Sequence, residues 1–381
     1  MMSSDVRRFM LPRIVISVLV VSFQSWMENV SVRAESTTDA KKPVEYLMIA
    51  PNGVTETKLG GWKKEGFSGI VLTLDERFEA PVYEHAARAI AAHGLDHYYW
   101  VEVARNPRFA SEHPEWMASL GSHDDWRKQF PKLRQTEEGE VAKAWPWVPI
   151  AYRDALDAHI ARIKGLLARV PADYRGLLLN DLQGGPSSCG CGNLHCRWAI
   201  DYHVPSTAEK SDRHDIAATF IAKVESLTSG KDVIPVWTTE CEQHDMALEK
   251  QPQNTWSTGY CGSVNCFNYC LERFSEQWKA LHSTHRGPIA VLALHKELRR
   301  SRTEYGPPGN WIKQAVTYLN QKDVKLVPQP KLWVVVQGYD VDFQEEQSAR
   351  KAAFEVGADV VLVARTGIDQ SFEPRIVKIN R

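Results

Sequence analysis

Eight short apolar runs alternate with helical patterns along this chain, and that alternation limits the fold more than any other feature. Most of the runs are continuous, as expected for parallel strands that are covered on both faces. The expected strands span Val44–Ala50, Ser68–Leu74, Asp96–Val103, Gly176–Leu182, Val233–Thr239, Ile289–Leu294, Leu332–Gln337 and Asp359–Val363. Repeated strand-then-helix units predict a (β/α)8 barrel of the TIM type, with a doubly wound open sheet as the alternative.

Between the strands, apolar residues recur three and four positions apart, which predicts helices. The expected helices span Pro81–His93, Tyr152–Val170, Asp212–Leu227, Leu271–His282, Asn310–Asn320 and Phe343–Val356. Only residues 367–381 follow the last strand, too few for a full closing helix, so the last βα unit is expected to be incomplete. Three connections, 104–151, 183–211 and 240–270, are far longer than turns, and loops of that length are usually functional.

The first 34 residues have the pattern of a secretory signal peptide. Arg7, Arg8 and Arg13 precede a short apolar core, and Ala34 ends the segment. That core is about half of the roughly 20 residues that a spanning helix needs, so no stable membrane anchor is expected. We expect a signal peptide at 1–34, a polar leader at 35–43 and one barrel domain at 44–381, in a secreted or periplasmic protein.

Charge and aromatic content narrow the choice of partner. The net charge is −1, so no general attraction to nucleic acid or anionic membrane is expected. Tryptophan is abundant, with 13 residues, and an indole offers a flat apolar face on which a sugar ring can stack. The expected partner is therefore a carbohydrate.

Carboxylates follow several of the expected strands, where a barrel builds its active site. They are Asp75, Glu102, Asp181, Glu240, Glu242, Glu297 and Asp340. Glycoside hydrolases use two carboxylates that flank the scissile bond. Asp181 and Glu240 end neighbouring strands and form the favoured catalytic pair, with Asp181 as nucleophile or base and Glu240 as acid. Alternatively, such carboxylates cap helices or pair with Arg105 or Arg365.

A second set of residues is expected to bind the substrate around this pair. The long loop after the third strand brings three tryptophans, and the other members lie at strand ends. The set comprises Glu102, Trp116, Trp145, Trp147, Trp237, His295 and Asp340. His295 has an alternative role in a solvated basic loop.

All seven cysteines lie between Cys189 and Cys270, in the loops after two neighbouring strands. In an exported protein disulfides are the first interpretation, with Cys189, Cys191, Cys196, Cys261, Cys266 and Cys270 as candidates. The alternative is a structural zinc held by thiolates, for which Cys189, Cys191, Cys196 and Cys241 are the candidate ligands. No other cofactor is expected, because no Gly-rich phosphate motif or His-Glu-x-x-His sequence is present.

Several segments resemble known secreted proteins. Tyr99–Pro107, with His113–Met117, resembles the third-strand region of bacterial secreted proteins classed as glycoside-hydrolase-like barrels. Cys189–Trp198, with Trp237–Cys241 and Ile368–Pro374, resembles an uncharacterised secreted family of planctomycete type, and this likeness spans most of the mature chain. It implies a barrel and supplies no reaction.

The likeness to other glycosidases has limits. The cysteines after the fourth strand are similar to the metal-binding cluster of some barrel β-galactosidases, with different spacing. Asn180 is followed by Asp181 where the large retaining clan has Asn-Glu, and the seventh strand ends at Gln337 instead of Glu. That clan's catalytic residues therefore do not carry over intact.

The sequence thus predicts an exported barrel that acts on carbohydrate, by hydrolysis through a carboxylate pair at the C-terminal rim. Two alternatives remain open at this stage. One is a glycan-binding barrel without catalysis, and the other is a metalloprotein with a cysteine-bound zinc.

Overall fold

The computed structural model describes seven stretches of the chain, and statements about structure concern these alone. They are residues 44–118, 130–150, 153–182, 213–237, 285–294, 329–369 and 372–378. Among them, no helix has the length and apolar character needed to cross a membrane.

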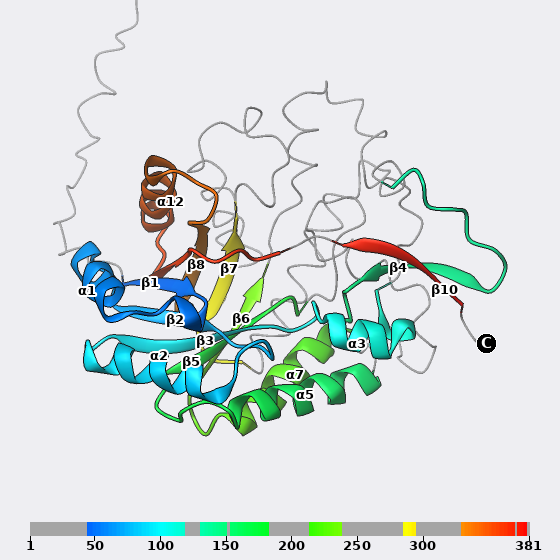
Figure 1. Cartoon of the computed structure of the whole chain (residues 1–381), viewed down its shortest axis with the longest axis horizontal. Coiled ribbons are helices and arrows are strands. Elements are labelled where there is room, and N and C mark those ends of the chain that lie inside the picture. Colours follow the sequence, from blue (N-terminus) through cyan, green and yellow to red (C-terminus); the bar gives the residue numbers. More distant parts are fainter. Residues whose placement is uncertain are drawn as a thin grey trace, which may run out of the picture. The chain divides into compact units, whose positions relative to one another are not determined.

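Eight parallel strands close into a barrel (Figure 1). Each strand pairs with the next along the chain, and the last strand pairs with the first. The barrel strands are β1 (Val44–Ile49), β2 (Gly69–Thr73), β3 (Asp96–Glu102), β5 (Gly176–Asn180), β6 (Asp232–Trp237), β7 (Ile289–Ala293), β8 (Leu332–Gln337) and β9 (Val360–Ala364). The predicted (β/α)8 architecture is confirmed, and all eight expected strands are present within two residues at each end.

Helices follow several of the strands and cover the outside of the barrel. They are α1 (Glu56–Glu65), α2 (Ala80–Ala92), α3 (Pro107–Glu112), α5 (Arg153–Leu167), α7 (Arg213–Leu227) and α12 (Phe343–Glu355). Local signals fix their ends: Asp342 forms a reciprocal capping box with Glu345 at the start of α12, and Gly66 ends α1 at φ 102°. The two helices expected at 271–282 and 310–320 lie outside the described residues.

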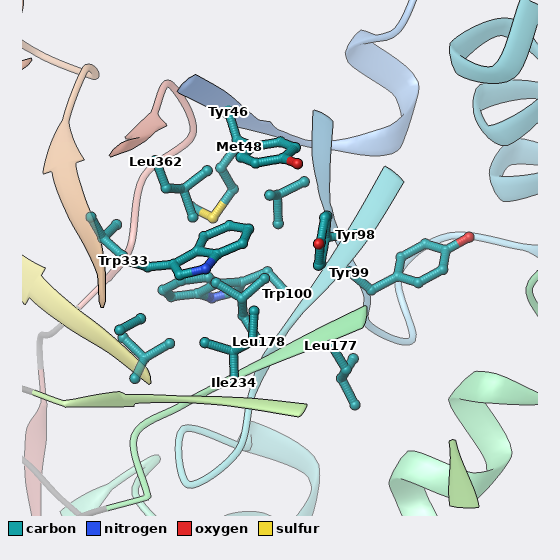
Figure 2. Close-up of a cluster of buried hydrophobic side chains, with 14 of the residues drawn as sticks. Tyr46, Met48, Tyr98, Tyr99, Trp100, Leu177, Leu178, Ile234, Trp333 and Leu362 are labelled. Carbon is teal, nitrogen blue, oxygen red and sulfur yellow. The ribbon is translucent and has the colours of Figure 1, made fainter. Parts of the chain in front are cut away.

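Large rings fill the N-terminal half of the barrel interior, beside glycines on the neighbouring strands. Tyr46 stacks on Trp333 with ring centroids 5.0 Å apart, and Tyr98 meets Trp333 edge-on at 5.1 Å (Figure 2). A Cβ added at Gly69 would collide with the Tyr46 ring, and one at Gly176 would lie 2.9 Å from the ring of Tyr98. Large rings beside glycines, which have no side chain, therefore fill this layer of the barrel interior.

The chain leaves the barrel after β9 without a closing helix in the described residues. Arg365, the residue directly after β9, contacts two helices. Its guanidinium donates to Glu346 of α12 at 2.9 Å and to Glu65 of α1 at 2.9 Å. This single side chain therefore links α12 to α1.

The C-terminal segment instead crosses to the loop that follows β3. There β10 (Glu373–Lys378) pairs antiparallel with β4 (Glu140–Trp145), as Figure 1 shows beside the barrel. An ion pair between Arg105 and Asp369 and a bond from the Tyr339 hydroxyl to the Ile368 carbonyl (3.4 Å) fix the path. The segment after β9 is thereby attached at the C-terminal ends of both β8 and β3.

Candidate active site at the C-terminal rim

Two acidic side chains meet where β3 and β5 end. Glu102 is the last residue of β3, and the barrel register places it opposite Asn180, the last residue of β5. Asp181 follows directly and is 1 % exposed. The register of β3 against β5 therefore places Asp181 one residue beyond the partner of Glu102, at the C-terminal end of the barrel.

Both carboxylate oxygens of Glu102 accept hydrogen bonds. The indole Nε1 of Trp100 donates to Oε1 at 2.6 Å, and the amide Nδ2 of Asn180 donates to Oε2 at 2.8 Å. Trp100 lies two residues earlier on the same strand, so its side chain and that of Glu102 share one face. The two donors hold the carboxyl plane in one orientation.

The neighbouring acid changes the protonation of Glu102. Burial raises the pKa of Glu102 well above its usual range, and the charge of Asp181 and a hydrogen bond with its side chain raise that pKa further. Two carboxylates in hydrogen-bond contact cannot both ionise at little cost, so the pair retains a proton at a pH where an ordinary glutamate has lost it.

Asp181 adopts a backbone conformation that favours few residue types. Its φ is 62°, in the left-handed region, which aspartate and asparagine tolerate better than other residues with a side chain. Asp340, after β8, has φ 51° and is exposed. The turn after β5 therefore aims the buried carboxyl of Asp181 at Glu102 through an uncommon conformation of the kind found at functional sites.

Arg162 of α5 supports the pair from outside the barrel. Its Nη1 donates to the backbone carbonyl of Glu102 at 2.8 Å, while Nε and Nη2 bind Glu76 at 2.7 and 3.1 Å. Burial alone would raise the pKa of Glu76, but the hydrogen bonds and charge of Arg162 bring it below its usual value. One buried guanidinium thus ties the chain after β2 to the end of β3.

Replacing Arg162 by methionine is expected to lower the free energy of unfolding by about 1–3 kcal/mol, because the Glu102 carbonyl loses its buried donor. Arg169→Met is the matched control. Arg169 lies in the turn directly after the same helix and binds the Phe78 carbonyl and the Glu79 carboxylate. Denaturant unfolding of both variants tests this; equal stability of the two would show that the contact with Glu102 has no special weight.

The tryptophans of the loop after β3 lie in different surroundings. Trp147 is fully buried in a small core with Ala104, Ala118 and Ala144, so its ring is closed to a sugar, contrary to the expectation. Its burial follows from its position, since the backbone of Trp147 bridges to Arg105 just after β3.

The other two indoles are half-buried and already carry a partner ring or cation. Trp116 stacks on His113 with centroids 3.7 Å apart, and Arg375 of β10 lies 4.2 Å above Trp145. Each indole can therefore offer a sugar only the part of its ring that its partner leaves uncovered. They remain predicted substrate-binding residues.

The ion pairs suggested as an alternative role for the acids at the strand ends are present for some of these residues. Asp75 pairs with Arg77 at 2.6 Å, and Arg105 and Arg365 bind Asp369 and Glu346. Those pairings therefore involve other acids than the buried pair.

Several predicted site residues lie outside the described residues. They are Glu240, His295 and every cysteine, together with the side chain of Trp237. Within the described stretches no group of three or more His, Cys, Asp or Glu side chains is placed to hold a metal ion. The Asp181–Glu240 pair, the disulfides and the alternative zinc site therefore stay predictions.

Comparisons with known proteins give fold-level similarity only. No family model matches the sequence, and no curated protein matches it. The chain is similar to an endo-1,4-β-D-mannanase from Thermotoga petrophila (10 % identity, TM-score 0.44, 84 % of this chain and 87 % of that one). It is also similar to a β-glucosidase from Thermotoga maritima (8 % identity, TM-score 0.41, 81 % of this chain and 76 % of that one).

A third similar structure is the β-galactosidase of Marinomonas ef1, at 9 % identity and TM-score 0.44. The match covers 84 % of this chain and 53 % of that enzyme, so this chain spans about half of its length. At such identities and TM-scores we take neither activity nor substrate from these proteins.

Proposed function

We propose that the protein is a glycoside hydrolase in which the Glu102 carboxyl, held by Asp181, donates the proton to the leaving-group oxygen. The observation that carries the proposal is the buried acid pair at the C-terminal ends of β3 and β5. A general acid must still hold its proton at the working pH, and the raised pKa of Glu102 meets that requirement.

The geometry of the pair also defines what each carboxyl can do. Hydrolysis of a glycosidic bond needs two carboxyls about 5–5.5 Å apart for retention, or about 6.5–9.5 Å apart for inversion. Glu102 and Asp181 share a hydrogen bond and are closer than that. They act as one proton-holding unit, and Asp181 raises the pKa of Glu102 instead of attacking the sugar, the role first assigned to it.

The second carboxylate must therefore come from another strand end. Glu240, expected just beyond the end of β6, is our candidate for the nucleophile or base, and β6 pairs directly with β5. In the proposed step the glycosidic oxygen takes the proton of Glu102 as its bond to the anomeric carbon breaks. Glu240, or water activated by it, forms the new bond to that carbon.

The test is hydrolysis of a panel of nitrophenyl glycosides by the wild-type protein, covering α and β linkages of the common hexoses, fucose and xylose. Release of nitrophenol with at least one substrate, above the rate of the Glu102→Gln variant, is expected. Saturable binding of sugars without turnover by the wild type would replace the hydrolase with a glycan-binding barrel.

A further inference from the structure

The segment 365–369, which we call the strap, follows β9 and contacts loops on opposite sides of the barrel. The Ile368 carbonyl accepts a hydrogen bond at 3.4 Å from the hydroxyl of Tyr339, two residues after β8. The next residue, Asp369, pairs with Arg105, three residues after β3. Because β3 and β8 are the third and seventh of eight strands in a closed barrel, they lie opposite one another. Two adjacent residues of the strap therefore bridge the mouth formed by the C-terminal ends of the strands.

The burial of the strap residues shows how they lie over this mouth. Gly367 and Asp369 are exposed, whereas Ile368 between them is 2 % exposed and belongs to the hydrophobic cluster of the barrel. A surface segment with one buried apolar side chain is anchored at that residue. In Figure 1 the segment runs as a red trace from the side of β8 toward β10. The strap therefore lies on the mouth and inserts Ile368 into it.

The strap divides the ring of strand ends into two parts. On one side of a line from β8 to β3 lie the ends of β9, β1 and β2, and on the other lie those of β5, β6 and β7. Glu102 ends β3 and Asp181 follows β5, so the acid pair borders the second part. A glycan bound at the acid pair therefore meets the strap if it extends toward β1 and β2.

Both ends of the strap are fixed. Arg365 donates from its backbone nitrogen to the Met48 carbonyl of β1 at 3.0 Å and from its guanidinium to Glu346 of α12 at 2.9 Å. Beyond the strap, β10 pairs with β4 along its whole length. We propose that the strap is a wall that determines specificity, because it confines a glycan chain to the part of the mouth bordered by β5, β6 and β7. This inference deepens the proposed function and rests on it for the place of the substrate.

Calorimetry on the full chain carrying Glu102→Gln tests the wall without turnover. This parent protein is titrated with the disaccharide and the hexasaccharide of α-1,4-glucan, β-1,4-glucan, β-1,4-mannan and β-1,4-xylan. Ile368→Ala combined with Asp369→Asn removes the buried anchor and the ion pair of the strap, which should then move aside. The ratio of hexasaccharide to disaccharide affinity should rise about fivefold in at least one series, the weight of one further hydrogen bond to the longer chain.

Asp157→Asn combined with Ile216→Ala, in the same parent, is the matched control. It also removes an exposed ion pair, here with Lys223, and truncates a partly buried isoleucine, on the outer helices α5 and α7. It should keep the affinity ratio of the parent. The proposal is overturned if the strap variant also keeps that ratio, if the control raises it equally, or if the parent binds none of the sugars. Length-dependent binding together with a wild type that hydrolyses no glycoside would remove the proposed hydrolysis alone and leave the wall.

Discussion

Glu102→Gln is expected to lower the rate of glycoside hydrolysis by about 10²–10⁴-fold, the usual contribution of a general acid. Glutamine keeps the size of the side chain and has no acidic proton to donate. Steady-state kinetics on the best nitrophenyl glycoside measures the effect. Glu79→Gln, at a side chain that is 86 % exposed, should retain the wild-type rate. A Glu102→Gln enzyme of wild-type rate would remove Glu102 from the mechanism.

The same substitution is expected to remove the loss of stability that the wild type shows above the ordinary pKa of glutamate. Because the folded pKa of Glu102 is raised, the folded protein binds this proton more tightly than the unfolded chain. The stabilisation is fully present below the unfolded pKa and is lost as pH rises through the folded value. Glutamine loses no proton, so melting curves over a pH series should show the stability of the variant, relative to the wild type, falling toward acid pH.

Trp333→Ala is expected to lower the free energy of unfolding by about 3–5 kcal/mol, the usual cost of removing a large buried ring. The indole is fully buried and contacts both Tyr46 and Tyr98 inside the barrel (Figure 2). The register partners of Tyr46 and Tyr98 are Gly69 and Gly176, which bring no side chain into this layer.

Phe343→Ala provides the comparison for this loss. Phe343 begins α12 and is 68 % exposed, so its truncation should change stability by well under 1 kcal/mol. Chemical denaturation of both variants decides the point. A small effect at Trp333 would mean that the interior layer repacks and does not depend on this ring.

The barrel could be predicted because each strand carries its own local signal. Runs such as Leu332–Gln337 are buried along their whole length, and a continuous apolar run is what that environment selects. Pairing of β10 with β4 could not be predicted, because it joins segments more than 200 residues apart that bear no unusual pattern.

The candidate site was only partly predictable, for a geometric reason. Glu102 and Asp181 were recognised as rim acids, but their contact depends on the register of β3 against β5. Arg162 carries no sequence signal of its role, since arginines on amphipathic helices normally face solvent. Trp100, two residues before Glu102, could have been found from the period-two alternation of a strand. Trp147 was expected to bind substrate because tryptophan is abundant in this loop, but abundance does not show whether a given ring is exposed, and this one is buried.

The most direct test of the proposed acid pair is the pH profile of kcat/KM for the wild type and Asp181→Asn. Asparagine also tolerates the left-handed backbone at this position, so the turn should persist. Removing the charge of Asp181 lowers the pKa of Glu102, and the alkaline limb of the profile reports that pKa. The account predicts that this limb moves to lower pH in Asp181→Asn. A limb that stays at the wild-type position, or moves to higher pH, would contradict it.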